Sequence, residues 1–173
     1  MKHPALQYLV FILLYGFIIS FMILFLRTTV FDIGIVNGRS MERAYIDEDL
    51  FLVNKIGPLF IPFRRGDVIQ FYDKSSRKLL IKRVIGLPGE TVKISRHTVL
   101  ITDGKGGLTE LSEPYLKAYT STDTSTGEVI IYDTIPPFSY FVLGDNRSAS
   151  TDSRTFGAVH RSLVTGLVIR IPW

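Results

Sequence analysis

The longest hydrophobic run of the chain begins at Ala5, ends at Leu26 and contains no charged residue. As an α-helix at about 1.5 Å per residue it would span roughly 33 Å, enough for the ~30 Å hydrocarbon core of a bilayer. A cleaved signal peptide has an apolar stretch of only about 7–15 residues followed by small residues, whereas this run stops at Arg27. A buried core helix is the alternative, but such helices seldom lack a polar face. The pattern therefore predicts one uncleaved transmembrane helix over residues 5–26.

The charges that flank this run bear on its orientation. Lys2 and the amino terminus lie at one end and Arg27 lies at the other. The positive-inside comparison is therefore nearly balanced and leans toward a cytoplasmic N-terminus. We expect a short cytoplasmic tail over residues 1–4 and an extracytoplasmic domain over residues 27–173, held at the cell membrane by a single span.

After residue 26 the pattern changes to short β-rich runs separated by turns that contain Gly, Pro, Asp and Asn. This spacing favours a mostly β domain of antiparallel sheets, with no internal repeat and no second domain. The small polar residues of segment 120–128 are typical of an exposed loop. The predicted strands are 50–54, 68–72, 79–85, 91–94, 98–102, 129–132, 140–143 and 163–171.

Composition narrows the function classes. Of the formal charges, 19 basic and 16 acidic side chains lie after residue 26, an excess too small to indicate a nucleic-acid partner. The chain has no cysteine, which excludes disulfides, thiolate metal sites and cysteine nucleophiles. Its histidines are His3, His97 and His160, too few for a histidine-rich metal site. We expect no metal and no cofactor.

The apolar segment 57–63 is followed directly by Arg64 and Arg65. Two interpretations are open. The segment enters the headgroup region of the bilayer and the arginines meet anionic lipid, or it forms a buried connection between strands.

Ser40 is the first candidate for chemistry. It follows the turn signal Asn37-Gly38 at the end of an apolar run, and the bulky residue Met41 comes after it. Taken alone, this pattern is also that of an ordinary surface serine in a turn.

Lys82 is the second candidate. In a strand, alternate side chains share a face, which places Lys82 between Leu80 and Val84 and puts Arg83 on the opposite, structural face. Desolvation among aliphatic neighbours lowers the pKa of a lysine from about 10.4, and a neutral lysine is a competent general base for a serine hydroxyl. A lysine that extends to water at a strand edge is the alternative.

A third segment, 140–157, combines a hydrophobic strand with a turn that is dense in Asp, Arg and Ser. Such a turn is either a solvated loop or a hydrogen-bonded network that fixes its neighbours.

In this order and behind an N-terminal apolar run, the three segments resemble the bacterial type I signal peptidases, which are membrane-bound serine endopeptidases with a Ser/Lys dyad. The resemblance covers nearly the whole chain, and the run Lys-Arg-Val-Ile-Gly-Leu-Pro-Gly-Glu is its most specific part. The matching segments are 38–41, 65–68, 82–90, 113–116 and 144–154.

The resemblance implies a signal-peptidase-like catalytic domain in which Ser40 is the nucleophile. Ser40 would attack the scissile carbonyl of a secretory pre-protein to form an acyl-enzyme. Lys82 would act as general base and later protonate the leaving amine. Ser150 would orient the lysine ammonium through a hydrogen bond.

The same resemblance gives supporting roles to neighbouring residues. Asp152 and Arg154 would hold the site together by a salt bridge, and Asp145 would act in the same way. The backbone N–H of Ser40 would serve the oxyanion hole. Some family members have a second serine donor at the position of Gly38, so Gly38 would act through its backbone conformation, and Met41 completes the nucleophile segment.

One departure from the family lies directly after Ser-Met. The usual x-Pro-Thr is replaced here by Glu42, Arg43 and Ala44. Loss of the proline leaves this turn less fixed, and Arg43 adds positive charge near the cleft. The departure puts substrate preference in question more than the chemistry.

Two alternative functions remain open at this point. One is a peptidase dedicated to a single pilus or conjugation component, and the other is a non-catalytic assembly factor. Related pilus-assembly proteins have lost the catalytic pair, whereas Ser40 and Lys82 are both present here. A Ser–His site with His97 or His160 is disfavoured, because neither lies in a segment that resembles an active-site box. The expected partners are secretory pre-proteins that carry signal peptides, and the lipid bilayer.

Overall fold

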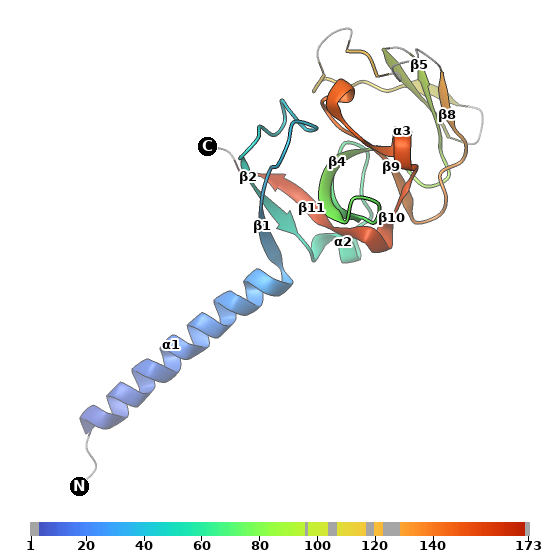
Figure 1. Cartoon of the computed structure of the whole chain (residues 1–173). Helices are drawn as coiled ribbons and strands as arrows, with labels where there is room; N and C mark the ends of the chain where they lie inside the picture. The colour runs from blue at the N-terminus through green and yellow to red at the C-terminus, as the bar shows by residue number, and fades with distance from the viewer. Residues whose placement is uncertain (1–3, 96, 104–106, 117–119, 123–128, 172–173) are drawn as a thin grey trace.

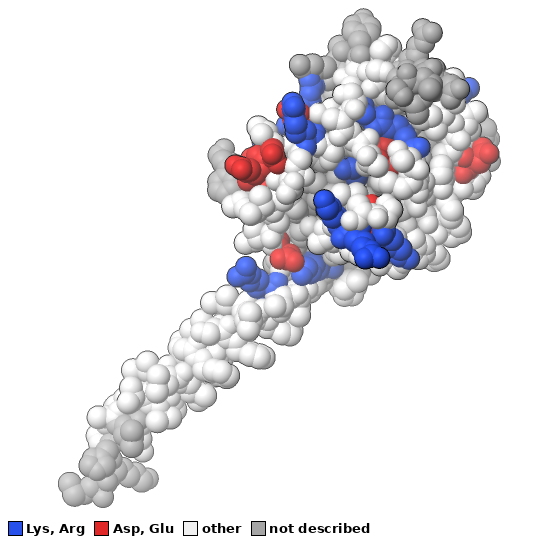
Figure 2. Space-filling view, in the orientation of Figure 1, with Lys and Arg blue, Asp and Glu red and all other residues white. Residues whose placement is uncertain are grey.

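A computed structural model describes residues 4–95, 97–103, 107–116, 120–122 and 129–171. Its N-terminal helix, α1 (Pro4–Thr29), extends away from the rest of the chain (Figure 1). Among the described residues α1 is the one helix long and apolar enough to cross a membrane. Figure 2 shows that it carries no charge along most of its length and that basic side chains gather where it meets the domain. Arg27 lies in its last turn.

The mostly β, antiparallel fold predicted from the sequence is confirmed. The described strands form a seven-stranded sheet in the order β1-β2-β11-β3-β4-β9-β10 and a four-stranded sheet in the order β7-β6-β5-β8. The strands are β1 (Phe31–Ile35), β2 (Leu50–Asn54), β3 (Val68–Asp73), β4 (Lys78–Gly86), β5 (Thr91–Ser95), β6 (Thr98–Thr102), β7 (Leu108–Glu110), β8 (Ile130–Tyr132), β9 (Ser139–Leu143), β10 (Val159–His160) and β11 (Val164–Arg170). Short helices occur at α2 (Gly57–Phe60), η1 (Arg147–Ala149), α3 (Ser153–Phe156) and η2 (Arg161–Leu163).

Three of these strands were not predicted, and β1 is the instructive one. Asp32 and Gly34 interrupt its apolar pattern, and both residue types are depleted in strands. β1 nevertheless pairs with β2 along its whole length. A Cβ at Gly34 would lie 2.3 Å from the ring of Phe51, so the glycine makes room for that ring. Tertiary pairing thus overrides local propensity.

Strand β9 is the centre of the core because it is buried on both faces. Phe141 and Leu143 belong to the hydrophobic cluster that includes the four-stranded sheet. Tyr140 and Val142 belong to a second cluster on the other face, with residues of β3 and β4. The chain that leaves β9 at Gly144 therefore starts from a rigid position.

The polar segment 120–128 does not behave as a simple exposed loop. Thr122 is 0% exposed, and its hydroxyl accepts a hydrogen bond from Arg147 Nη1 at 2.7 Å. Residues 123–128 lie outside the described part of the chain.

Candidate active site

Ser40 and Lys82, 42 residues apart in the sequence, are in direct contact. Lys82 Nζ donates a hydrogen bond to Ser40 Oγ at 2.7 Å and a second to the carbonyl of Ile81 at 3.1 Å. Lys82 lies on β4, whose pairing with β9 begins only at Arg83. The side chain is 2% exposed.

Burial changes the acid–base properties of Lys82. Desolvation lowers the pKa of its ammonium from 10.5 to about 8, although the negative charges of Asp152 and Asp145 oppose this shift. At pH 7 about one tenth of a group with this pKa is uncharged, against less than about one in a thousand for an ordinary lysine. The arrangement can therefore take a proton from the hydroxyl that it contacts.

The turn that carries Ser40 is fixed on both sides. Gly38 has φ 97°, a conformation that side-chain-bearing residues rarely adopt, and its N–H donates to Asp47 Oδ1 at 2.7 Å. Met41 is fully buried in a cluster with Val36 and with residues of β2, β3 and β11. The N–H of Ser40 has no acceptor among the described residues, which leaves it available to an oxyanion.

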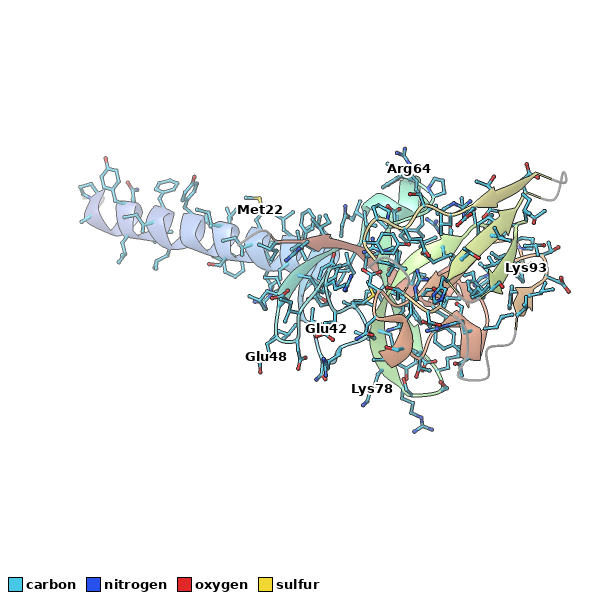
Figure 3. All side chains as sticks on the ribbon, turned by 90° about the horizontal axis from the view of Figure 1, so that it is seen from above. Met22, Glu42, Glu48, Arg64, Lys78 and Lys93 are labelled. Carbon is cyan, nitrogen blue, oxygen red and sulfur yellow. The ribbon has the colours of Figure 1, made fainter. Side chains whose placement is uncertain are left out.

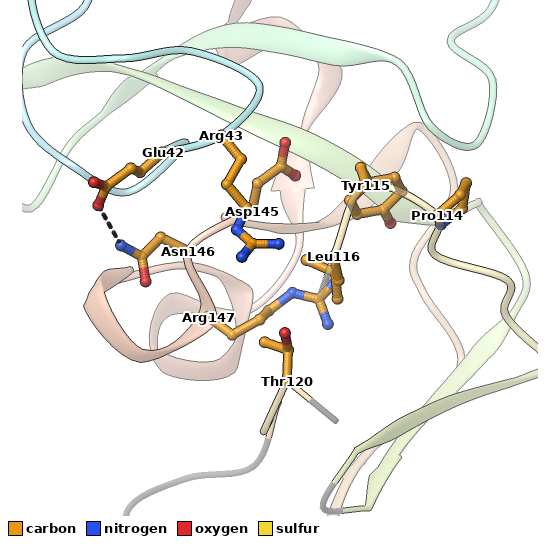
Figure 4. Close-up of a pocket in the computed structure, with 9 residues that line it drawn as sticks. All are labelled: Glu42, Arg43, Pro114, Tyr115, Leu116, Thr120, Asp145, Asn146 and Arg147. Atoms are coloured by element: carbon orange, nitrogen blue, oxygen red, sulfur yellow. Dashed lines mark hydrogen bonds between the residues drawn. The ribbon is translucent and has the colours of Figure 1, made fainter. Parts of the chain in front are cut away.

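A close approach of segment 144–146 holds the serine from the other side. The N–H of Asn146 donates to the carbonyl of Ser40 at 3.0 Å. The amide of Asn146 donates to Glu42 at 3.0 Å, as Figure 4 shows. A Cβ at Gly144 would lie 2.5 Å from the Ser40 carbonyl and 2.2 Å from Ser150 Oγ. Only glycine allows these segments to meet in this way.

The two aspartates expected to support the site are each paired with an arginine. Asp152 is 0% exposed and accepts from Arg154 Nε at 2.8 Å, the pairing that the resemblance implied. Asp152 also accepts from the N–H of Gly144 at 3.0 Å. Asp145 pairs instead with Arg83, whose Nε lies 2.8 Å from its carboxylate.

A third buried pair was missed from the sequence. Arg147 pairs with Glu113 and donates to the carbonyl of Gly144 at 3.1 Å. The ring of Tyr115 lies under the Arg83 guanidinium, 4.2 Å from its carbon. The segment 113–116 was part of the resemblance, and the acidic residue Glu113 two positions before the aromatic Tyr115 was the available signal. Nothing in the sequence marked Arg147, 34 residues away, as the partner of Glu113.

The expected hydrogen bond between Ser150 and Lys82 is not made in this structure. Ser150 Oγ is buried and has no hydrogen-bond partner. Lys82 Nζ directs two of its three N–H groups to Ser40 Oγ and to the carbonyl of Ile81, and the third does not meet Ser150 Oγ. No cluster of three or more metal-ligating His, Asp or Glu side chains occurs within the described ranges.

Comparisons with known proteins bear on this arrangement. The family model described as signal peptidase, peptidase S26, matches residues 7–173. Signal peptidase I U of Bacillus subtilis is 35% identical over 139 residues, which cover 79% of this chain and 72% of that protein. Signal peptidase I of Bacillus caldolyticus is 36% identical over 151 residues, covering 83% of this chain and 80% of that protein.

A solved structure of a signal peptidase I is also similar to this chain in fold. The crystal structure of a signal peptidase I from Enterococcus faecalis V583 matches with a TM-score of 0.51 and 36% identity. The match covers 62% of this chain and 97% of that one.

The buried ammonium predicts an unusual effect on stability. We expect Lys82→Met to raise the free energy of unfolding at pH 7 by about 1 kcal/mol, because it removes a desolvation cost of about 3 kcal/mol and two hydrogen bonds of about 1 kcal/mol each. The folded pKa of about 8 lies below the unfolded value of 10.5. The unfolded chain therefore binds more protons between these values, and wild-type stability rises with pH across that window.

Denaturant unfolding of the full chain in detergent at pH 7, 9 and 10.5 measures this difference. The difference in free energy of unfolding between Lys82→Met and wild type should shrink as pH rises. Lys78→Met, at an exposed position of the same strand, is the matched control and should change stability by less than about 0.5 kcal/mol. A Lys82→Met variant less stable than wild type at pH 7 would contradict the expectation.

Proposed function

The chain belongs to the signal peptidase family, peptidase S26, and from this we propose that it is a membrane-bound serine endopeptidase that removes signal peptides from secretory pre-proteins, with Ser40 as nucleophile and Lys82 as general base. As a family member it is a hydrolase of the signal peptidase I type. The observation that carries the proposal is the 2.7 Å contact between Lys82 Nζ and Ser40 Oγ at a buried lysine with a lowered pKa.

The proposed reaction has two halves. Neutral Lys82 takes the proton of Ser40 as Oγ attacks the scissile carbonyl, and the backbone N–H of Ser40 donates to the oxyanion. Lys82 then gives its proton to the departing amine, which leaves an acyl ester on Ser40. In the second half Lys82 takes a proton from water, the resulting attack cleaves the ester, and the new carboxylate leaves as Ser40 recovers its proton.

Ser150 fits the second half of this cycle. Once Ser40 Oγ is part of an ester, the lysine loses its hydroxyl partner. The buried Ser150 Oγ has no other partner to give up, and it lies against Gly144, beside the Ser40 carbonyl. We assign it the orienting role, with Asp145, Asp152 and Arg154 as supporting residues that hold the segment in place.

The proposed membrane arrangement follows from α1. Residues 5–26 form the anchor, residues 1–4 the cytoplasmic tail and residues 27–173 the extracytoplasmic catalytic domain. The N–H of Val30 still donates to the carbonyl of Leu26 at 2.9 Å, and β1 starts at Phe31. Such a short junction supports a catalytic domain held near the bilayer, where signal peptides are embedded.

The alternative of a dedicated peptidase or a non-catalytic assembly factor for a pilus or conjugation system is not favoured. The relatives that cover most of this chain are named signal peptidase I.

Cleavage of a pre-protein whose signal ends in Ala-x-Ala tests the dyad. We expect the full chain in detergent to cleave it, and Ser40→Ala and Lys82→Met each to lose roughly 10³-fold or more in kcat/KM. Ser75→Ala and Lys78→Met, at exposed positions of the β3–β4 hairpin, are the controls. Full activity of either dyad variant, with its fold intact by circular dichroism, would refute the assignment.

The pH profile tests the state of Lys82. Because the base must be neutral, kcat/KM should fall about tenfold for each pH unit below about 8 and level off above it. The charge of Asp152 raises the pKa of Lys82, so Asp152→Asn should move the acid limb to lower pH. A limb that stays in place in that variant would argue against Lys82 as the titrating group.

A second contact with the bilayer concerns the segment 57–63. Leu59, Phe60 and Ile61 are 71%, 81% and 57% exposed, whereas Pro58 and Phe63 are buried. The middle of the segment is therefore not a buried connection. Phe138 lies beside Leu59 and Phe60 along one surface hollow. The sequence interpretation placed both Arg64 and Arg65 against lipid, but Arg65 forms a salt bridge with Glu90 and is not available for this contact. Arg64 remains, and it projects from the side of the domain opposite Lys78 (Figure 3).

Bilayer-quenching fluorescence measures this contact in the full chain. Trp173 is the one tryptophan, so Phe60→Trp is made together with Trp173→Phe and placed in vesicles with quencher-labelled lipid. We expect strong quenching, since an exposed aromatic in the interface is within reach of the acyl chains. Leu108→Trp in the same background, on the edge strand β7, is the control. Equal quenching at the two positions would count against the contact.

A further inference from the structure

A second binding region lies directly beside the proposed catalytic serine. A cavity of about 620 Å³ opens between residues 42–43, residues 114–116 and residues 145–147. Neither Ser40 nor Lys82 lines it. It shares the short turn after Ser40 with the dyad, and the reaction proposed above makes no use of it.

The ionic groups around this cavity are paired, with one exception. Glu42 accepts from Arg39 Nε at 3.0 Å and from Asn146 at 3.0 Å. Asp145 is held by Arg83, and Arg147 by Glu113.

Arg43 is the exception. Its guanidinium has no hydrogen bond or ion pair with a described residue. Figure 4 shows it reaching into the middle of the cavity. Counted together with the partners Arg39, Arg83 and Glu113, the charged groups of the lining leave one surplus positive charge. A forked guanidinium of this kind matches a carboxylate.

The backbone holds Arg43 in this position at a cost. Its φ is 100°, a region that residues with a Cβ rarely occupy and that typically costs about 1–3 kcal/mol. A proline, with φ near −65°, does not fit this conformation. The residue that replaces the usual proline after Ser-Met is thus also the one whose backbone turns a cation toward the cavity.

The direction of the peptide follows from the membrane arrangement. The apolar part of a signal peptide lies in the bilayer that holds α1, so residues before the cut approach from the side of α1. The short helix η1 (Arg147–Ala149), which borders the cavity through Arg147, lies on the side of the domain away from α1 (Figure 1). A peptide that approaches from the side of α1 and passes Ser40 would therefore leave toward the cavity.

We propose that this cavity is a subsite for an acidic side chain of the substrate, Asp or Glu, within the first four residues after the cut, and that Arg43 binds its carboxylate. Three residues of chain between Ser40 and Arg43 span at most about 11 Å, and an extended peptide that advances about 3.3 Å per residue covers this distance in about three to four residues. The inference rests on the proposed function, because it needs the peptide to be placed by Ser40.

The test uses a series of peptides with a small-x-small cleavage motif, in which Glu is placed at each of the four positions after the cut in turn. Peptides with Gln or Lys at the same position are the references, and the enzyme is the full chain in detergent. We expect one position at which Glu exceeds Gln by about fivefold in kcat/KM, as for a partly exposed ion pair. Arg43→Gln should bring that ratio to about 1. Arg43→Lys should retain part of it, and Arg43→Glu should invert the preference toward Lys.

Arg77→Gln, at an exposed position of the β3–β4 turn, removes the same charge elsewhere and should leave the ratio unchanged. A ratio of 1 at all four positions, or a ratio that Arg43→Gln and Arg43→Glu do not alter, would overturn the subsite. Peptide affinities for the Ser40→Ala protein give the same ratios without turnover. These affinities test the subsite even if the full chain cuts none of the peptides. A failure to cut any peptide would overturn the proposed function, and it would not by itself overturn the subsite.

Discussion

The pairing of each nearby carboxylate with an arginine is the constraint on which the site depends. Asp145 and Asp152 both act on Lys82, and negative charge raises the pKa of a lysine. Their charges are engaged by Arg83 and Arg154 through two-pronged contacts. Because each aspartate is neutralised by its own partner, desolvation remains the dominant influence on Lys82. The same carboxylates left unpaired would hold the lysine as an ammonium.

The same pairs also shape the chain. Arg154 donates to the carbonyls of Arg147 and Ser150, and Arg147 donates to that of Gly144. The turn after β9 is therefore closed on itself by guanidinium groups rather than by regular secondary structure. Since β9 is buried on both faces, this closed turn has a fixed base. That combination brings Gly144 close enough to Ser40 for the serine to face Lys82.

The sequence predicted those features that depend on local pattern. Strand alternation placed Lys82 and Arg83 on opposite faces, and the apolar run predicted α1 to within three residues of each end. The partners of Arg147, Arg65 and Glu42 were out of reach, because they lie 34, 25 and 104 residues away and nothing in the intervening chain marks them. The resemblance supplied the pairing of Asp152 with Arg154. The expected Ser150–Lys82 bond is not present, since a flexible ammonium chooses among acceptors by geometry that no sequence pattern encodes.

Three unfavourable features lie close together around Ser40. They are the buried Lys82, the unpartnered hydroxyl of Ser150 and the backbone of Arg43 at φ 100°. Each costs free energy when taken alone. Ser150 Oγ is also the one buried side-chain polar atom without a partner in the described part of the chain, so the surrounding protein is otherwise well satisfied. Strain that persists beside a rigid, fully paired network points to selection for what the strained groups do. A base of lowered pKa, a free hydroxyl and a cation turned toward a cavity are the groups that the proposed reaction and the proposed subsite would use.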